Sequence, residues 1–272
     1  MAGSSNSSKK SGEHLFFLGY AAFHEKKEST EGGACLLKHV TSFNENNSCS
    51  YRWQGVKKSK EAPVNKIYDS VKDSSIRTMG DDWIADQSDG VVIKTLKKAK
   101  SNKSVVELER FATGFAPYGN QVHHVLPCGA FKKAAFKVSE STTGLLLVII
   151  GGLLEEKYNI NHKDNMIVLP TNEKVSCRVG LPRHYGSHPT YSNKIQGMVT
   201  EALDPYKKVA DQIAKGEPHD EVDPVTLKEA LEDISEQMFD NILKERPEIL
   251  GKCKQDFVKV NTLPEHVYAV SL

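Results

Sequence analysis

The sequence has few cysteines, and their spacing is not typical of a structural role. Five occur in 272 residues, none in a CxxC pair: Cys35, Cys49, Cys128, Cys177 and Cys253. An odd and scattered set argues against a disulfide framework and against a zinc ribbon. We therefore expect these cysteines to be reduced thiols.

Long hydrophobic runs are also absent. No apolar stretch follows a basic start at the N-terminus, and the apolar run from Gly144 to Leu154 is far shorter than the roughly 20 residues needed to span a bilayer. We expect a soluble protein that has no Sec signal and no membrane contact. Since 39% of the residues are hydrophobic, the chain can bury a real core, which excludes disorder throughout.

The formal net charge is only +1, but the charges are unevenly distributed. Residues 201–272 contain 9 Lys or Arg against 16 Asp or Glu, a net charge of −7. Residues 1–200 contain 27 against 19, a net charge of +8. The sequence thus combines a basic body with an acidic C-terminal segment.

Histidine is uncommon, yet five of the ten histidines lie between Val122 and Tyr191, and four of these five occur as two closely spaced pairs. His123 and His124 follow a short apolar lead typical of a strand, in which adjacent side chains point to opposite faces. One ring can then bind a metal while its neighbour points toward a substrate. His184 and His188 are four residues apart and would share one face if their segment is helical.

These four histidines suit metal-dependent phosphodiester hydrolysis. Imidazoles from His123, His184 and His188 would leave one coordination position open, whereas a structural zinc site closes with a fourth protein ligand. His124 would be available as a general base, because the unperturbed pKa of imidazole lies near neutrality. A divalent ion would stabilise charge on the phosphate and on the departing oxygen. We interpret the other six histidines as structural: His14, His24, His39, His162, His219 and His266.

Four motifs occur in a fixed order around these histidines. They are VHHVLP at Val122–Pro127, YNIN at Tyr158–Asn161, NMIVLP at Asn165–Pro170 and HYGSHPTY at His184–Tyr191. In this order they resemble the AHH family of HNH/endonuclease VII (His-Me finger) nucleases. The resemblance implies an α+β fold with a ββα-metal core, in which a hairpin delivers the histidine pair and a helix delivers the last ligands.

The resemblance also implies a role for each site residue. His124 would be the general base, and His123, His184 and His188 would bind a divalent ion such as Mg, Mn, Ni or Zn. Asn165 would hold the base-bearing loop and orient its imidazole. The reverse assignment of His123 and His124 stays open, and Asn165 could instead cap a helix or form a turn.

The sequence departs from the family pattern in two places. Val122 replaces the alanine in the family name, a change between small apolar residues that should not affect the chemistry. The separation of Asn165 from His184 is longer than in the similar colicin nucleases. It predicts an inserted loop before the ligand-bearing helix, and this loop contains Cys177, Arg178 and Arg183. The two arginines could clamp phosphate or simply be solvated, and Tyr191 could pack or contact substrate.

We divide the chain into four parts. Residues 1–12 are a flexible tail, 13–104 an N-terminal accessory region that begins with a strand near His14–Phe23, 105–202 the nuclease domain and 203–272 an acidic helical extension. A basic run from Lys94 to Lys103 is a solvated face or a phosphate contact, and Lys132, Lys133 and Lys137 could also meet a nucleic acid.

The extension is predicted to be helical. Lys194–Ala214 has a recurrent apolar pattern, and Asp223 begins a second helix. Its apolar face consists of Leu227, Leu231, Ile234, Met238, Ile242 and Leu243. We interpret this face as ordinary packing against the nuclease domain, although an acidic segment could instead shape a DNA groove by repelling phosphate.

The expected function is metal-dependent hydrolysis of DNA with little sequence preference. The resemblance implies an antibacterial toxin that has a cognate immunity protein. It would be made in the producer's cytoplasm, exported by a specialised system such as type VI secretion, and active in the target-cell cytoplasm. An RNase on the same scaffold and a non-catalytic, metal-stabilised binding module are the alternatives.

Overall fold

The structure is a computed structural model, and not all of the chain is described. It describes residues 33–37, 43–45, 47–69, 111–112, 114, 118–140, 142, 144–171, 173–184, 186 and 188–256. The expected tail at residues 1–12, the expected strand at His14–Phe23 and the basic run at Lys94–Lys103 lie outside these residues.

Two short antiparallel strands form the sheet of the described structure. β1 (Asn120–His124) pairs with β2 (Met166–Pro170), so that Asn120 lies opposite Pro170 and His124 lies opposite Met166. The strand expected at the histidine pair is confirmed. The expected hairpin is not, because α7 (Cys128–Ser139) and α8 (Leu145–Glu155) separate the two strands in sequence.

Two helices from the N-terminal part of the chain pack against these strands. α2 (Tyr51–Ser59) begins at Ser50, whose side chain accepts a hydrogen bond from the backbone of Trp53, and α3 (Val64–Asp69) follows it. Gly55 lets α2 approach β1 closely, since a Cβ there would lie 2.7 Å from Val122 Cγ1. These helices share one hydrophobic core with the strands. The domain boundary near residue 104 stays a prediction.

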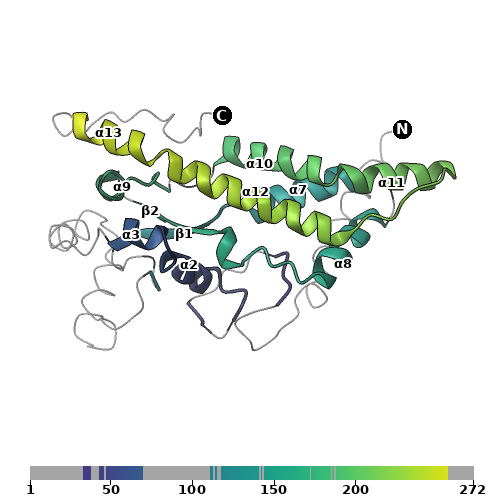
Figure 1. The fold of residues 1–272 in the computed structure, drawn as a ribbon, viewed down its shortest axis with the longest axis horizontal. Helices are drawn as coiled ribbons and strands as arrows, with labels where there is room; N and C mark the ends of the chain where they lie inside the picture. The colour runs from purple at the N-terminus through teal and green to yellow at the C-terminus, as the bar shows by residue number, and fades with distance from the viewer. Residues whose placement is uncertain are drawn as a thin grey trace, which may run out of the picture.

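The C-terminal part of the described chain consists of four helices. They are α10 (Pro189–Ala202), α11 (Asp204–Lys215), α12 (Pro224–Lys244) and α13 (Arg246–Asp256). In Figure 1, α10, α12 and α13 run along one side of the strands, and α2 and α3 lie on the other. The continuous pattern over Lys194–Ala214 is divided at Leu203, because Pro205 cannot continue a preceding helix.

The second predicted C-terminal helix is confirmed. Asp223 caps α12 by accepting a hydrogen bond from the backbone of Val225. Five of the six predicted apolar residues are buried and Leu243 is partly buried. α12 packs against α8, α10 and the short 3-10 helix η3 (Lys163–Asn165), so ordinary packing of this face is also confirmed.

The described residues form a mixed fold of helices and one small sheet, which is compatible with the expected α+β class. Its apolar residues form a hydrophobic core cluster that includes residues from α2, α3, both strands and α12. Within the described residues, no helix has the length and apolar character required to cross a membrane.

We predict that Tyr68→Phe destabilises the fold by about 1–2 kcal/mol. The buried Tyr68 hydroxyl donates to Val168 O at 2.8 Å and accepts from Val168 N at 3.2 Å, so its loss leaves both groups of β2 without this partner. Urea unfolding monitored by circular dichroism measures the change. The matched control is Tyr206→Phe, because the buried Tyr206 hydroxyl has no hydrogen-bond partner among the described residues. Equal midpoints for both variants would contradict the prediction.

Candidate functional site

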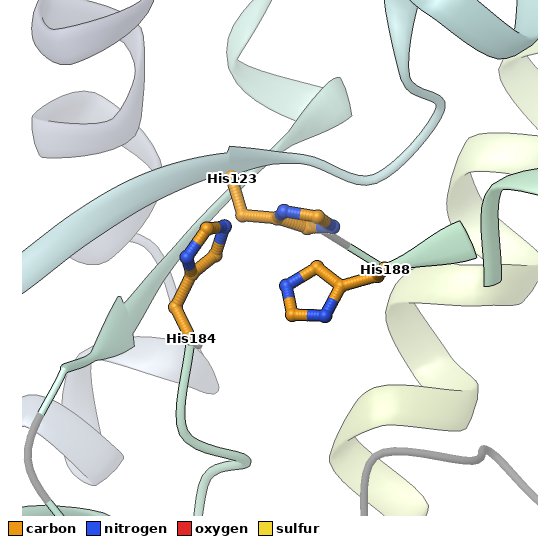
Figure 2. Close-up of side chains that lie close together, drawn as sticks. All are labelled: His123, His184 and His188. Carbon is orange, nitrogen blue, oxygen red and sulfur yellow. The ribbon is translucent and has the colours of Figure 1, made fainter. Parts of the chain in front are cut away.

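Three of the four clustered histidines meet in space. Figure 2 shows the rings of His123, His184 and His188 converging on one point. Their candidate ligand atoms all lie within 4.8 Å of one another. The ring centroids of His123 are 5.1 Å from His184 and 5.6 Å from His188, and the last two are 4.8 Å apart. The proximity expected for these three side chains is therefore confirmed.

Each of the three histidines is held by a different local structure. His123 lies on β1 opposite Ile167. The backbone N–H of His184 donates to Pro170 O at 2.7 Å, which fixes the incoming loop to the end of β2. His188 is the N-cap residue of α10, and its carbonyl accepts from the backbone N–H of Ser192 at 2.9 Å.

Gly186, the described residue between His184 and His188, is not helical. Gly186 between them has φ +71°, a left-handed conformation that ends any helical path and favours glycine. α10 begins only at Pro189, whose fixed φ suits the first position of a helix. The condition that both histidines share one helical face is therefore not met, since His184 and Gly186 both lie before the start of α10.

The chemistry of this donor set fits a divalent transition metal. All three rings are half-buried, and imidazole nitrogen suits ions such as Zn²⁺ or Ni²⁺. Burial lowers the pKa of His188, which favours the neutral form that can bind a metal. Within the described chain the cluster contains three residues, the number typical of catalytic zinc sites, which keep a position for water or substrate.

His124 lies in a different environment from its neighbour. Its side chain is only 7% exposed, and its ring centroid is 5.4 Å from that of Tyr51 on α2. His124 Nε2 lies 2.9 Å from Asn161 Oδ1. Because Asn161 donates through Nδ2 to Leu37 O, its Oδ1 is the acceptor, so His124 Nε2 carries the proton. The basic lone pair of the neutral ring is then on Nδ1.

Asn165 holds the chain segment that follows His124. Its Oδ1 accepts from Leu126 N at 2.5 Å, and its Nδ2 donates to Leu126 O at 3.0 Å and to Ile160 O at 2.8 Å. Ser235 Oγ on α12 donates to the same Oδ1 at 3.1 Å. Asn165 is thus bonded to the backbone beyond His124, whereas the imidazole ring itself is bonded to Asn161.

Tyr191 supports the cluster from α10. Its ring centroid lies 5.5 Å from that of His123, and its hydroxyl donates to Val125 O. Burial of the side chain raises the pKa of Tyr191. Tyr191 therefore packs against the ring of His123. On the loop, Arg183 Nε donates to Thr171 O at 3.0 Å.

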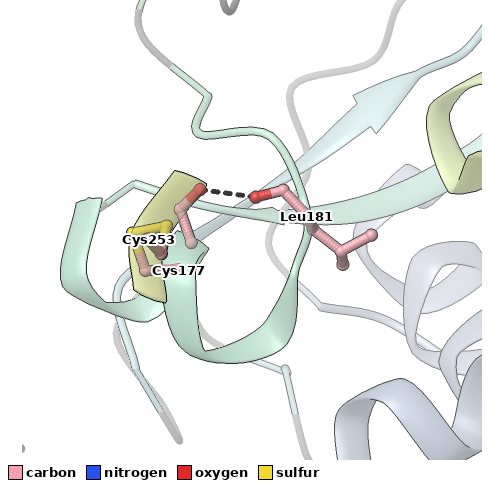
Figure 3. Close-up of a disulfide and its surroundings, with 4 residues drawn as sticks. Cys177, Leu181 and Cys253 are labelled. Carbon is pink, nitrogen blue, oxygen red and sulfur yellow. Dashed lines mark hydrogen bonds between the residues drawn. A yellow bond between two sulfur atoms is a disulfide. The ribbon is translucent and has the colours of Figure 1, made fainter. Parts of the chain in front are cut away.

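The segment expected to be an inserted loop contains a helix. Cys177 and Arg178 lie on α9 (Glu173–Val179). Figure 3 shows that Cys177 forms a disulfide with Cys253 on α13, so the expectation that all cysteines are reduced thiols was wrong. The two cysteines are 76 residues apart, and packing of α13 on α9 brings them together. Cys35, Cys49 and Cys128 are not part of a disulfide.

Further contacts hold the loop between α9 and His184. Ser176 Oγ donates to Leu181 O at 2.5 Å, and Arg246 Nε on α13 donates to Val179 O at 3.0 Å. Gly180 has φ +69°, and a Cβ there would lie 2.7 Å from the side chain of Arg246. The disulfide and these contacts fix α13 against α9, the helix that precedes the loop carrying His184.

We predict that Cys177→Ser combined with Cys253→Ser destabilises the oxidised protein by about 2–4 kcal/mol, because the cross-link restricts the unfolded chain. Calorimetry without reductant measures the loss as a lower Tm. Dithiothreitol should lower the Tm of the wild type and leave that of the double variant unchanged. A wild-type Tm that is insensitive to dithiothreitol would contradict this prediction.

Sequence reasoning missed two residues that support the site. Asn161 was part of a quoted motif but had no assigned role, and Ser235 was not considered. Both are buried polar side chains, and buried polar groups almost always have partners. Burial of its side chain could have marked Asn161 as a candidate supporting residue, since a buried amide needs hydrogen-bond partners. Only the fold shows that one of these partners is His124.

The residues of the candidate site lie in a part of the chain that matches a known protein family. Residues 104–238 match the model of AHH, a nuclease family of the HNH/ENDO VII superfamily with conserved AHH. This region includes the four clustered histidines, Asn161, Asn165 and Ser235, and extends beyond the predicted boundary at Ala202. Neither the curated proteins nor the solved structures contain a match to the chain. Residues 104–238 of this chain therefore belong to the AHH family of nucleases.

Proposed function

We propose that this nuclease is a metal-dependent endonuclease that hydrolyses phosphodiester bonds of DNA with little sequence preference. The observation that supports it best is the convergence of His123, His184 and His188 within the family-matched residues. Two separate segments of the chain, β1 and the motif at His184–Tyr191, deliver these rings, so the proximity of His123 to the other two is a product of the fold.

The three histidines would hold one divalent ion through ring nitrogens. A bound ion would supply positive charge to the phosphate and the departing oxygen. His124 removes the proton from the attacking water as the general base, through the lone pair on Nδ1. Asn165 fixes the backbone beyond His124 through Leu126, so the histidine pair keeps its place at the end of β1.

Charge on the surface supports a nucleic-acid substrate. Residues 1–200 have a net charge of +8, and Lys133 and Lys137 are exposed on α7, which begins four residues after His124. Such lysines bind phosphates without reading bases, which fits low sequence specificity. The exposed acidic side chains of α12 repel phosphate, so DNA would avoid this helix: Glu229, Glu232, Asp233, Glu236 and Asp240.

The biological role we propose is that of an antibacterial toxin. It would be made in the producer's cytoplasm with a cognate immunity protein, exported by a specialised system such as type VI secretion, and active in the target cytoplasm. Its support is the resemblance of the ordered motifs to nuclease toxins. Survival of target cells that express the wild type or the His124→Ala variant tests this role.

We predict that the purified chain degrades supercoiled plasmid only when a divalent ion is added. The assay compares EDTA with magnesium, manganese, nickel and zinc, and runs structured RNA in parallel. His124→Ala should lower the cleavage rate by about 100- to 10,000-fold, the usual contribution of a general base. The control is His219→Ala, because His219 is exposed and lies outside the cluster.

Other outcomes of this assay have distinct meanings. Cleavage of RNA but not of plasmid would identify an RNase on the same scaffold. Absence of cleavage with every ion and both polymers would overturn the enzymatic proposal in favour of a metal-stabilised binding module. Full activity of His124→Ala would show that His124 is not the base.

We predict that His188→Ala and His124→Ala separate metal binding from catalysis. His188→Ala should weaken Zn²⁺ or Ni²⁺ binding by at least about 100-fold, since even loss of a residue that only orients a ligand costs about 10- to 100-fold. His124→Ala should leave this affinity within about 3-fold, because its ring is bonded to Asn161 and lies outside the three-residue cluster. Isothermal titration calorimetry measures both. A larger loss in His124→Ala than in His188→Ala would reverse the assignment of His123 and His124.

A further inference from the structure

We propose that Asn161 is the residue that positions the imidazole of His124 and sets which ring nitrogen carries the proton. This inference rests on the proposed role of His124 as general base. It moves the orienting function from Asn165, which bonds backbone groups, to a second buried asparagine four residues earlier in the chain.

The hydrogen bond between the two side chains has a defined direction. Asn161 is fully buried, and its Nδ2 donates to Leu37 O at 2.8 Å and lies 3.4 Å from Cys35 Sγ. A backbone carbonyl only accepts, so the amide cannot rotate by 180° without placing Oδ1 against Leu37 O. Oδ1 therefore faces His124 as an acceptor, and only a protonated Nε2 satisfies it.

Two neighbouring segments hold Asn161 itself. Its backbone N–H donates to Asn159 Oδ1 at 2.9 Å. The segment containing Cys35 pairs with the same loop: Cys35 N donates to Tyr158 O at 3.0 Å, and Ile160 N donates to Cys35 O at 2.8 Å. Residues 33–37 lie outside the family-matched region, yet they provide the carbonyl that fixes the Asn161 amide.

The two asparagines therefore divide the support of His124. Asn165 fixes the backbone that follows the histidine, and Asn161 fixes the rotation and the tautomer of the ring. Without an acceptor at this position, Nε2 loses its buried partner and the ring can rotate about its χ2 torsion. The base would then be present but misaligned, which lowers kcat more than it changes KM or metal affinity.

The first measurement follows the ring proton directly. In protein labelled with ¹⁵N-histidine, the His124 Nε2–H should give a slowly exchanging imidazole signal, assigned by its loss in His124→Ala. We expect this signal to be lost in Asn161→Ala and in Asn161→Leu, which keeps the side-chain volume but has no acceptor. Gln54→Ala is the matched control, because it removes another buried amide, one that bonds Ser48 O, and should keep the signal.

The second measurement is a double-mutant cycle on plasmid cleavage. Asn161→Leu should lower kcat by about 10- to 100-fold, in the range seen when a residue that orients a functional imidazole is lost. It should leave KM and the Zn²⁺ affinity within about 3-fold. In a His124→Ala background the same substitution should have no further effect, because Asn161 acts only through that ring.

The outcomes separate this inference from the proposed function. If the wild type cleaves plasmid and His124→Ala does not, but Asn161→Leu keeps both the ring signal and full kcat, only the role of Asn161 is overturned. If Asn161→Leu lowers kcat by the same factor in the wild type and in the His124→Ala background, the role of Asn161 is also overturned. Such a result would show a general structural effect of the substitution. If the wild type shows no cleavage, the proposed function fails, and the ring signal alone decides whether Asn161 holds His124.

Discussion

The carboxamide of Asn165 joins the three segments on which the candidate site is built. It bonds both backbone groups of Leu126 at the end of β1, the carbonyl of Ile160 and the hydroxyl of Ser235 on α12. The amide is buried, so each unmade bond would cost about 1–3 kcal/mol, and the geometry is strongly specified. The position of the histidine pair, the loop that contains Asn161 and the seating of α12 depend on this one side chain.

The pleat of β1 then gives two adjacent histidines different surroundings. His123 points toward His184 and His188 and remains half-buried, while His124 points into the interior and bonds Asn161. The two environments favour different chemistry. The cluster offers several imidazole nitrogens to one cation, whereas the single fixed ring has a defined tautomer. A shift of register by one residue would exchange the two faces, so the pairing with β2 specifies which histidine can join the cluster.

Segments far from the motifs provide much of the support. α13 bonds Val179 through Arg246 and is linked to α9 by the Cys177–Cys253 disulfide. It thereby stabilises the segment that precedes His184. At the other end of the chain, residues 33–37 pair with the loop that carries Asn161. The family motifs contribute the clustered histidines and Asn165, and these remote segments contact the loops that carry them. This division explains why nuclease chemistry can be expected from about seventy residues, although the described site uses contacts from a much longer stretch.

The sequence by itself determined the features that depend on local pattern and residue chemistry. The apolar lead before His123 predicted a strand, and Asp223 with the apolar spacing predicted α12. The ordered motifs implied that one ring of the histidine pair lies beside His184 and His188, and the structure places His123 there. Only the tertiary structure decided the partner of each buried polar group. The bond from His124 to Asn161 spans 37 residues, and the disulfide spans 76. Nor did spacing show that Gly186, between His184 and His188, has a left-handed rather than a helical backbone. Periodicity and capping act within a few residues, whereas hydrogen-bond and disulfide partners are chosen by how distant segments pack.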